Sequence, residues 1–280
     1  MTEKTVYLVP TMHGDKDDAK SISSRLRQIQ SMHQRFTMGV EDCPSSSYND
    51  YKTKSEQEVI EQFFDRGNKG YREFKMLEAL EHRNLRRTDI QIFGIDAEKE
   101  PKEKALGLIR QYNAILGTVA IFTNLKDQSE IAEKGLLVLK DSLDLREPEM
   151  IRNILDLYKN SDLPVVVTLG GAHVLNIKDE LSKFVPIELV EDSEQKANST
   201  KRLHISALQI ENKAVKSIED NNVKDTFTLT KYVLFTNIYY DKTGKSREKP
   251  LDEYAERVVL SDSVQELNKI FNDLRGLERK

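Results

Sequence analysis

Short apolar runs alternate along this chain with longer segments in which apolar side chains recur every three or four residues. The runs are rich in β-branched residues and indicate buried strands: Val6–Val9, Phe36–Val40, Ile90–Ile95, Val165–Leu169 and Ile187–Val190. Helix-type periodicity marks most of the segments between and after them: Asp15–His33, Ser55–Leu85, Ala105–Phe122, Ser129–Leu143 and Val174–Phe184. This alternation predicts an α/β fold with a mostly parallel central sheet and helices on both faces.

Two helix starts are expected between the third and fourth strands. The charge run Glu98–Lys104 predicts a solvated helix start. Asp144 fits an acidic N-cap, with Glu147 three residues later as in a capping box, and Pro148 is tolerated in a first turn. We therefore expect a separate helix that begins near Asp144 and ends near Tyr158.

The pattern changes after Glu191. Residues 192–201 are polar and loop-like, whereas Leu203–Ile210 and Phe227–Tyr240 carry residue types typical of strands. Residues 263–277 resemble a closing amphipathic helix. We expect residues 1–191 to form an α/β core that carries the site, and residues 192–280 to extend the same domain with additional C-terminal strands.

Composition narrows the classes of partner. The 280 residues carry a formal net charge of −4, and a nucleic-acid partner is not expected because such proteins usually present a basic face. The single cysteine, Cys43, excludes an intrachain disulfide and a multi-cysteine metal site. No apolar stretch approaches the roughly 20 residues of a membrane helix, and the N-terminus lacks the apolar segment of a signal peptide. We expect a soluble, cytoplasmic protein without a membrane partner; the sequence leaves non-classical secretion and the oligomeric state open.

Polar side chains follow four of the predicted strands. His13 follows the first strand, Glu41 the second, Asp96 the third and His173 the fourth. Because the carboxyl ends of parallel strands meet at one edge of a sheet, these side chains are expected to face a common pocket. Each residue also has a simpler interpretation. The two histidines could cap a helix or bind backbone, Glu41 could be a solvent-facing strand terminus, and Asp96 could cap the next helix.

Two chemistries fit this set of residues. His13, Glu41 and His173 could ligate Zn²⁺, Mn²⁺ or Co²⁺ and leave one position open for a water molecule, which the metal would activate. Without a metal, a histidine beside a carboxylate forms a general-base pair, because the carboxylate fixes the tautomer of the imidazole. The sequence leaves both possibilities open.

Arg146 is the candidate that would support either chemistry. At the start of the predicted helix it would reach the edge of the sheet, where it could hold Glu41 or Asp96 in a bidentate pair. It could instead bind a substrate carboxylate or a developing oxyanion. Asn153 shares its helix face and is a second candidate for orienting a carboxylate.

The order of these motifs resembles a known superfamily over roughly residues 5–190. The matching segments are Met38–Glu41, Phe93–Asp96, the series Arg146, Met150 and Ile154, and Gly170–His173. The superfamily groups erythromycin esterases, TraB/PrgY-like proteins, TIKI proteases, ChaN-type haem-binding proteins and a domain of Pasteurella-type toxins. The first motif departs from its pattern, because Pro10 stands where glycine is usual.

The resemblance implies a bacterial-type hydrolase that cleaves an ester or amide bond in a small-molecule or peptide substrate. It implies that His13, Glu41 and His173 share one pocket, with Arg146 and Asp96 in support. In the TIKI proteins of this superfamily, peptide cleavage uses Mn²⁺ or Co²⁺. ChaN-type members bind haem, so the alternatives are a non-catalytic haem- or ligand-binding protein, or a toxin- or effector-type domain.

Overall fold

The computed structural model describes most of the chain. The described residues are 4–11, 16–44, 90–119, 124–190, 210–211, 213–218, 226–239 and 249–278. The predicted helix Ser55–Leu85 and residues 203–209 of a predicted strand lie outside them. The chain forms two compact units, the first comprising Met1–Glu103 with Asp144–Asp192, and the second Lys104–Leu143 with Ser193–Lys280. The single-domain organisation expected from the sequence stays a prediction.

The first unit is built on a five-stranded parallel sheet. Its strands are β1 (Val6–Thr11), β2 (Thr37–Pro44), β3 (Gln91–Asp96), β4 (Val165–Gly170) and β5 (Ile187–Leu189), in the order β3-β2-β4-β1-β5. Each had been predicted from its apolar run, and the parallel α/β fold is confirmed. β2 runs on to Pro44, beyond the predicted end at Val40, with an irregular register after Val40.

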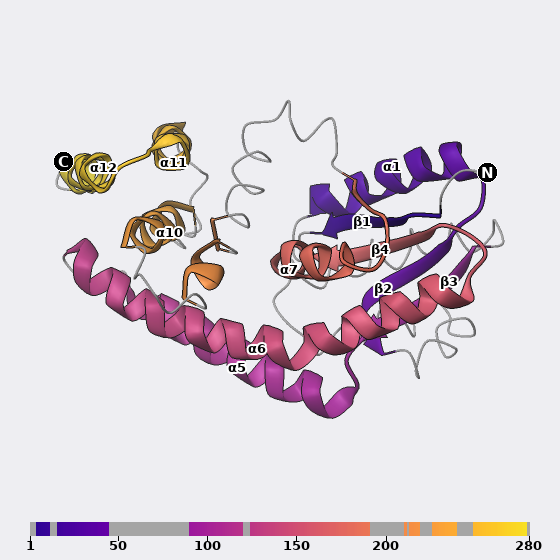
Figure 1. The fold of residues 1–280 in the computed structure, drawn as a ribbon. Helices are drawn as coiled ribbons and strands as arrows, with labels where there is room; N and C mark the ends of the chain where they lie inside the picture. The colour runs from indigo at the N-terminus through magenta and orange to yellow at the C-terminus, as the bar shows by residue number, and fades with distance from the viewer. Residues whose placement is uncertain are drawn as a thin grey trace. The chain divides into compact units, whose positions relative to one another are not determined.

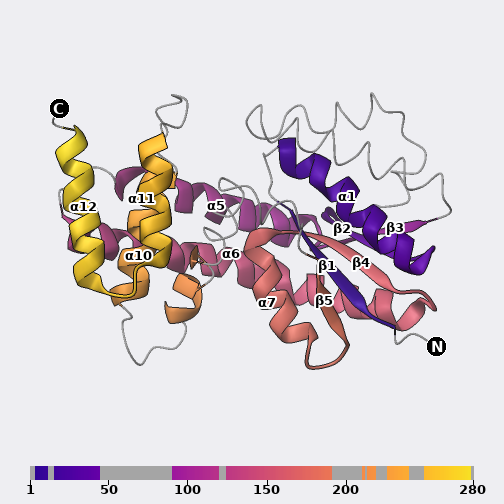
Figure 2. The same ribbon diagram turned by 90° about the horizontal axis from the view of Figure 1, so that it is seen from above.

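Helices cover both faces of this sheet (Figure 1 and Figure 2). On one face, α1 (Lys16–His33) buries Ile22, Leu26 and Ile29 against alternate residues of β1 and β2. On the other face, the C-terminal part of α6 (Leu125–Asn160) and α7 (Gly171–Leu181) cover the opposite set of side chains. Met150 and Ile154 of α6 are fully buried there. The period of two along the strands thus separates the two cores.

The helix predicted to start at Asp144 does not exist as a separate element. α6 is one helix of 36 residues that continues through Pro148. The expected capping box was wrong because the Glu147 side chain binds His173 instead of the backbone of its own helix. A proline inside a helix removes one backbone donor but does not by itself end the helix when tertiary contacts hold both sides.

The described elements of the second unit are helical. Its helices include the C-terminal part of α5 (Lys99–Val119), the N-terminal part of α6, α10 (Thr226–Tyr239), α11 (Lys249–Leu260) and α12 (Val264–Glu278). Residues 210–211 and 213–218 are also helical, so the predicted strand Leu203–Ile210 is wrong at Ile210. The strand predicted over Phe227–Tyr240 was wrong, since α10 occupies that segment. α10 is buried on several sides by its own unit and therefore lacks the one-sided apolar stripe that identifies a surface helix. No helix in the described ranges has the length and apolar character needed to span a bilayer.

Candidate functional site

Four of the five predicted site residues converge at the carboxyl ends of the parallel strands. Glu41 lies near the end of β2, Asp96 is the last residue of β3, and His173 lies in the first turn of α7 after β4. Arg146 reaches them from α6. The fifth residue, His13, lies outside the described residues.

Arg146 is the centre of this group. Its Nε and Nη2 donate to Oδ1 and Oδ2 of Asp96, both at 3.0 Å, which is the bidentate pair expected from the sequence. Nη2 also donates to Glu41 Oε1 at 2.8 Å, and Nη1 lies 3.2 Å from His173 Nε2. One guanidinium therefore joins residues that are far apart in the sequence.

Glu147 fixes the other side of the His173 ring. Its Oε1 lies 2.9 Å from His173 Nδ1, and its Oε2 accepts a hydrogen bond of 3.3 Å from Asn176 Nδ2. Arg146 has only donors, so His173 Nε2 accepts and Nδ1 carries the proton that is donated to Glu147. His173 thus presents its lone pair on Nε2, which also lies 3.5 Å from Glu41 Oε1.

Further donors, from the backbone and from Lys102, bind the carboxylates of Glu41 and Asp96. The Gly170 amide donates to Glu41 Oε2, and the Ala97 amide donates to Asp96 Oδ1 at 2.8 Å. Lys102 Nζ forms an ion pair of 2.8 Å with Asp96 Oδ2. The Gly170 contact follows from the topology, since β2 and β4 are neighbours and Glu41 lies just past their last regular pair, Val40 opposite Thr168.

The group is desolvated. Asp96 is 0% exposed, Arg146 and His173 are each 5% exposed, and Glu41 is 8% exposed. Buried charges are tolerated when they are paired and hydrogen-bonded, as these are. Glu41 and Asp96 form ion pairs with Arg146, and Asp96 also with Lys102, while Glu147 binds the His173 ring.

The described side chains do not form a metal site. Among them, no group of three or more His, Cys, Asp or Glu residues is arranged to hold a metal ion. Glu41 and His173 approach each other, but the guanidinium of Arg146 donates to both and occupies the position that a cation would need. The predicted ligand set of His13, Glu41 and His173 is left untested, because His13 lies outside the described residues.

Sequence reasoning missed two members of the group. Glu147 was interpreted as part of a helix cap, and Lys102 as one of a run of solvated charges, whereas Lys102 is 8% exposed. Glu147 is adjacent in the sequence to the predicted site residue Arg146, which could have marked it as a candidate. Only the tertiary structure, however, shows that both residues contact His173. Asn153 binds the backbone carbonyls of Ile95 and Asp96 instead of a carboxylate.

Comparison with protein families, with curated proteins and with solved structures finds no match to this chain. The superfamily resemblance therefore keeps the standing of a sequence-based expectation, and the chemistry of the site has to be argued from its geometry.

Proposed function

We propose that this protein hydrolyses an ester or amide bond, with His173 as the general base. The observation that carries the proposal is the pair Glu147–His173, in which a buried carboxylate lies 2.9 Å from Nδ1, so that Nε2 is the accepting nitrogen of the ring. A carboxylate in that position orients the ring and stabilises the imidazolium that forms during proton transfer.

The reaction would follow in two proton transfers. His173 Nε2 takes a proton from a water molecule as the water oxygen attacks the substrate carbonyl carbon. A tetrahedral oxyanion and an imidazolium result, and Glu147 stabilises the imidazolium. The imidazolium then returns the proton to the leaving alkoxide or amine as the carbon–oxygen or carbon–nitrogen bond breaks, which releases a carboxylic acid and an alcohol or amine.

Arg146 would stabilise the charge that develops on the substrate. Its Nη1 lies 3.2 Å from His173 Nε2, so a water molecule that replaced this hydrogen bond at Nε2 would lie beside the guanidinium. Its remaining donors stay bound to Asp96 and Glu41, which hold the guanidinium in a fixed orientation. Fixed donors in a desolvated site stabilise an oxyanion without reorganisation.

The geometry favours the metal-free form of this chemistry over the alternatives. A metal ion at His173 Nε2 would lie beside the positively charged guanidinium of Arg146, whereas a neutral water molecule need only replace the one N–H that Arg146 Nη1 donates to that atom. We propose a small-molecule ester or a peptide as the substrate. A nucleic acid is not expected, because the chain carries a net charge of −4.

A screen with chromogenic esters and peptides, before and after dialysis against a chelator, tests the proposal. We expect turnover that survives the chelator and falls about 10²-fold or more in His173→Gln. The matched control is His33→Gln, because His33 lies in the same unit and binds the Tyr7 hydroxyl away from the network. Equal rates in wild type and His173→Gln would rule out the assignment of the base.

A further inference from the structure

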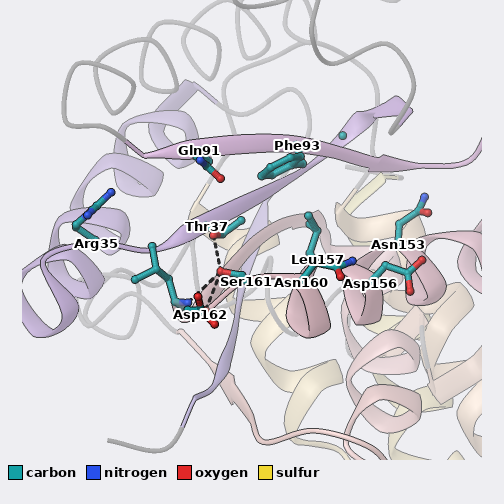
Figure 3. A pocket seen from close by; sticks show the side chains of 12 residues that line it. Arg35, Thr37, Gln91, Phe93, Asn153, Asp156, Leu157, Asn160, Ser161 and Asp162 are labelled. Atoms are coloured by element: carbon teal, nitrogen blue, oxygen red, sulfur yellow. Dashed lines mark hydrogen bonds between the residues drawn. The ribbon is translucent and has the colours of Figure 1, made fainter. Parts of the chain in front are cut away.

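A cavity of about 480 Å³ lies between the sheet and α6, apart from the charged network. One side is formed by Gln91 and Phe93 of β3, and the other by the last turns of α6 (Figure 3). Arg35 and Asn153 lie at opposite ends of the cavity (Figure 3). This volume is within the range of small-molecule sites, and none of the charged residues of the network lines it.

The polar groups at the floor of the cavity already have hydrogen-bond partners within the protein. Thr37 Oγ1 lies 2.7 Å from Ser161 Oγ, and the Leu163 amide donates to the same Ser161 oxygen at 3.0 Å. β2 contributes Thr37, and the segment after α6 contributes Ser161 and Leu163. These bonds fix the shape of the cavity and leave recognition to the side chains around its rim.

The rim combines an aromatic face with hydrogen-bonding groups. Phe93 is 37% exposed although it lies in a strand. Four side chains on the rim make no hydrogen bond to another described residue: Gln91, Asp156, Asn160 and Asp162. Two amides and two carboxylates beside an aromatic ring offer both donors and acceptors to a flat, hydroxylated ligand.

The charges around the cavity do not suit a phosphate. Asp156 and Asp162 outnumber the single cation of the lining, Arg35. The nearby helix end is the carboxyl end of α6, where the macrodipole is negative, and Lys4 Nζ already binds the carbonyls of Tyr158 and Ser161 there. Anion sites are instead built from helix N-termini and clustered cations.

We infer that this cavity binds an uncharged ring compound with neighbouring hydroxyl groups, either a nucleoside or a sugar. The ring would stack on Phe93, as bases do on aromatic side chains. Asp156 and Asp162 would accept hydrogen bonds from the hydroxyls, as an acidic residue does from ribose in dinucleotide sites. Binding here does not depend on the proposed hydrolysis, because no network residue lines the cavity.

Calorimetric titration of the full chain with adenosine, adenosine monophosphate and methyl glucoside tests this inference. We expect adenosine or the glucoside to bind, and adenosine to bind more tightly than its monophosphate. Phe93→Ala should weaken binding about tenfold, whereas Phe93→Tyr should preserve it. The matched control is Phe184→Ala, since Phe184 is 67% exposed in the same unit and does not line the cavity.

Two results would overturn the inference. One is the absence of binding by both neutral ligands at millimolar concentration, and the other is unchanged affinity in Phe93→Ala. Binding of the glucoside alone would identify a sugar as the ligand, and binding of adenosine alone would identify a nucleoside. Circular dichroism of Phe93→Ala separates loss of the site from loss of the fold, which is not expected for a partly exposed side chain.

Discussion

Arg146 is the residue on which the buried charges depend. A single atom, Nη2, donates both to Glu41 and to Asp96, and Nη1 is directed at His173. Without the guanidinium, the two carboxylates would stay close together in a desolvated environment, and Lys102 would remain as a cation beside Asp96. The energetic consequence is therefore larger than the loss of one hydrogen bond.

Arg146→Met is expected to lower the free energy of unfolding by about 3–5 kcal/mol, because it removes the cation that two buried carboxylates share. Arg146→Lys should recover only part of this, since an ammonium keeps the charge but not the planar set of donors. Urea unfolding followed by far-ultraviolet circular dichroism gives both values.

Arg152→Met is the control for this comparison. Arg152 lies on the same helix, its side chain is 66% exposed, and it pairs with Glu149 at 2.7 Å. An exposed pair of this kind contributes at most about 1 kcal/mol. If Arg146→Met cost no more than Arg152→Met, the buried ion group would not be a stabilising feature of the fold.

Most residues of the charged network could be predicted individually from the sequence. Glu41, Asp96 and His173 could be placed together because parallel strands end at one edge, and the bidentate pair of Arg146 with Asp96 was among the stated possibilities. Glu147 could not be placed, because its position on the helix is compatible with a cap as well as with a tertiary contact. Only the packing of α6 against α7 distinguishes the two.

Gly39 of β2 shows how closely α6 approaches the sheet. A Cβ atom at this position would lie 2.8 Å from Ile95 Cγ2 and 3.3 Å from Leu157 Cδ1. Ile95 comes from the neighbouring strand and Leu157 from α6, and both belong to the core on that face of the sheet. The glycine therefore permits the close contact between three elements.

Gly39→Ala is expected to destabilise the protein by about 1–3 kcal/mol, because the added methyl overpacks this core. Gly107→Ala is the matched substitution, since a Cβ there meets no atom within 4 Å and the residue lies within α5. Alanine is favoured over glycine in a helix by up to about 1 kcal/mol, so Gly107→Ala should stabilise. Thermal unfolding of both variants checks the opposite signs; equal shifts of the two melting temperatures would contradict this account.

Elements whose apolar residues recur with a clear period were predicted correctly, and elements without such a period were not. The strands of the parallel sheet and the helices α1, α7 and α12 follow their apolar patterns. α10 carries residues such as Val233 and Phe235 that are typical of strands, and both are buried within the second unit. Because α10 is buried on several sides, its sequence shows neither the two-residue alternation of a strand nor the one-sided apolar stripe of a surface helix. The prediction therefore depended on residue propensity, which favoured a strand.

The two units of the whole molecule differ in how they hold buried polar groups. The first pairs carboxylates with cations at the edge of its sheet. In the second, the Tyr112 hydroxyl donates to Glu211 and also contacts the Tyr232 hydroxyl. No pattern in the sequence indicates this cluster, because its three residues come from separate segments that were not expected to pack together.

Burial raises the pKa of Glu211, and the hydrogen bond from Tyr112 opposes this shift only in part. Below the pKa of the unfolded state the carboxyl is protonated in both states, and its contribution to stability is fully present. As the pH rises through the folded-state pKa, the buried group must ionise and that contribution is lost. The second unit should therefore be more stable at mildly acidic than at neutral pH.

Glu211→Gln is expected to reduce this pH dependence, because the amide accepts the Tyr112 hydrogen bond but does not ionise. Hydrogen exchange of residues 104–119 and 226–239, corrected for the intrinsic effect of pH, measures the stability of this unit. Glu253→Gln, on the exposed side of α11, is the control. If Glu211→Gln kept the pH dependence of the wild type, another group would be responsible.

The central claim for the whole molecule is that Glu147 and His173 form a catalytic pair. The most direct test is the kcat/KM of Glu147→Gln on a substrate that the wild type hydrolyses, with Glu149→Gln, two residues away and paired with Arg152, as the control. We expect a loss of about 10²-fold or more in Glu147→Gln and a wild-type value in Glu149→Gln. A wild-type kcat/KM in Glu147→Gln would contradict it.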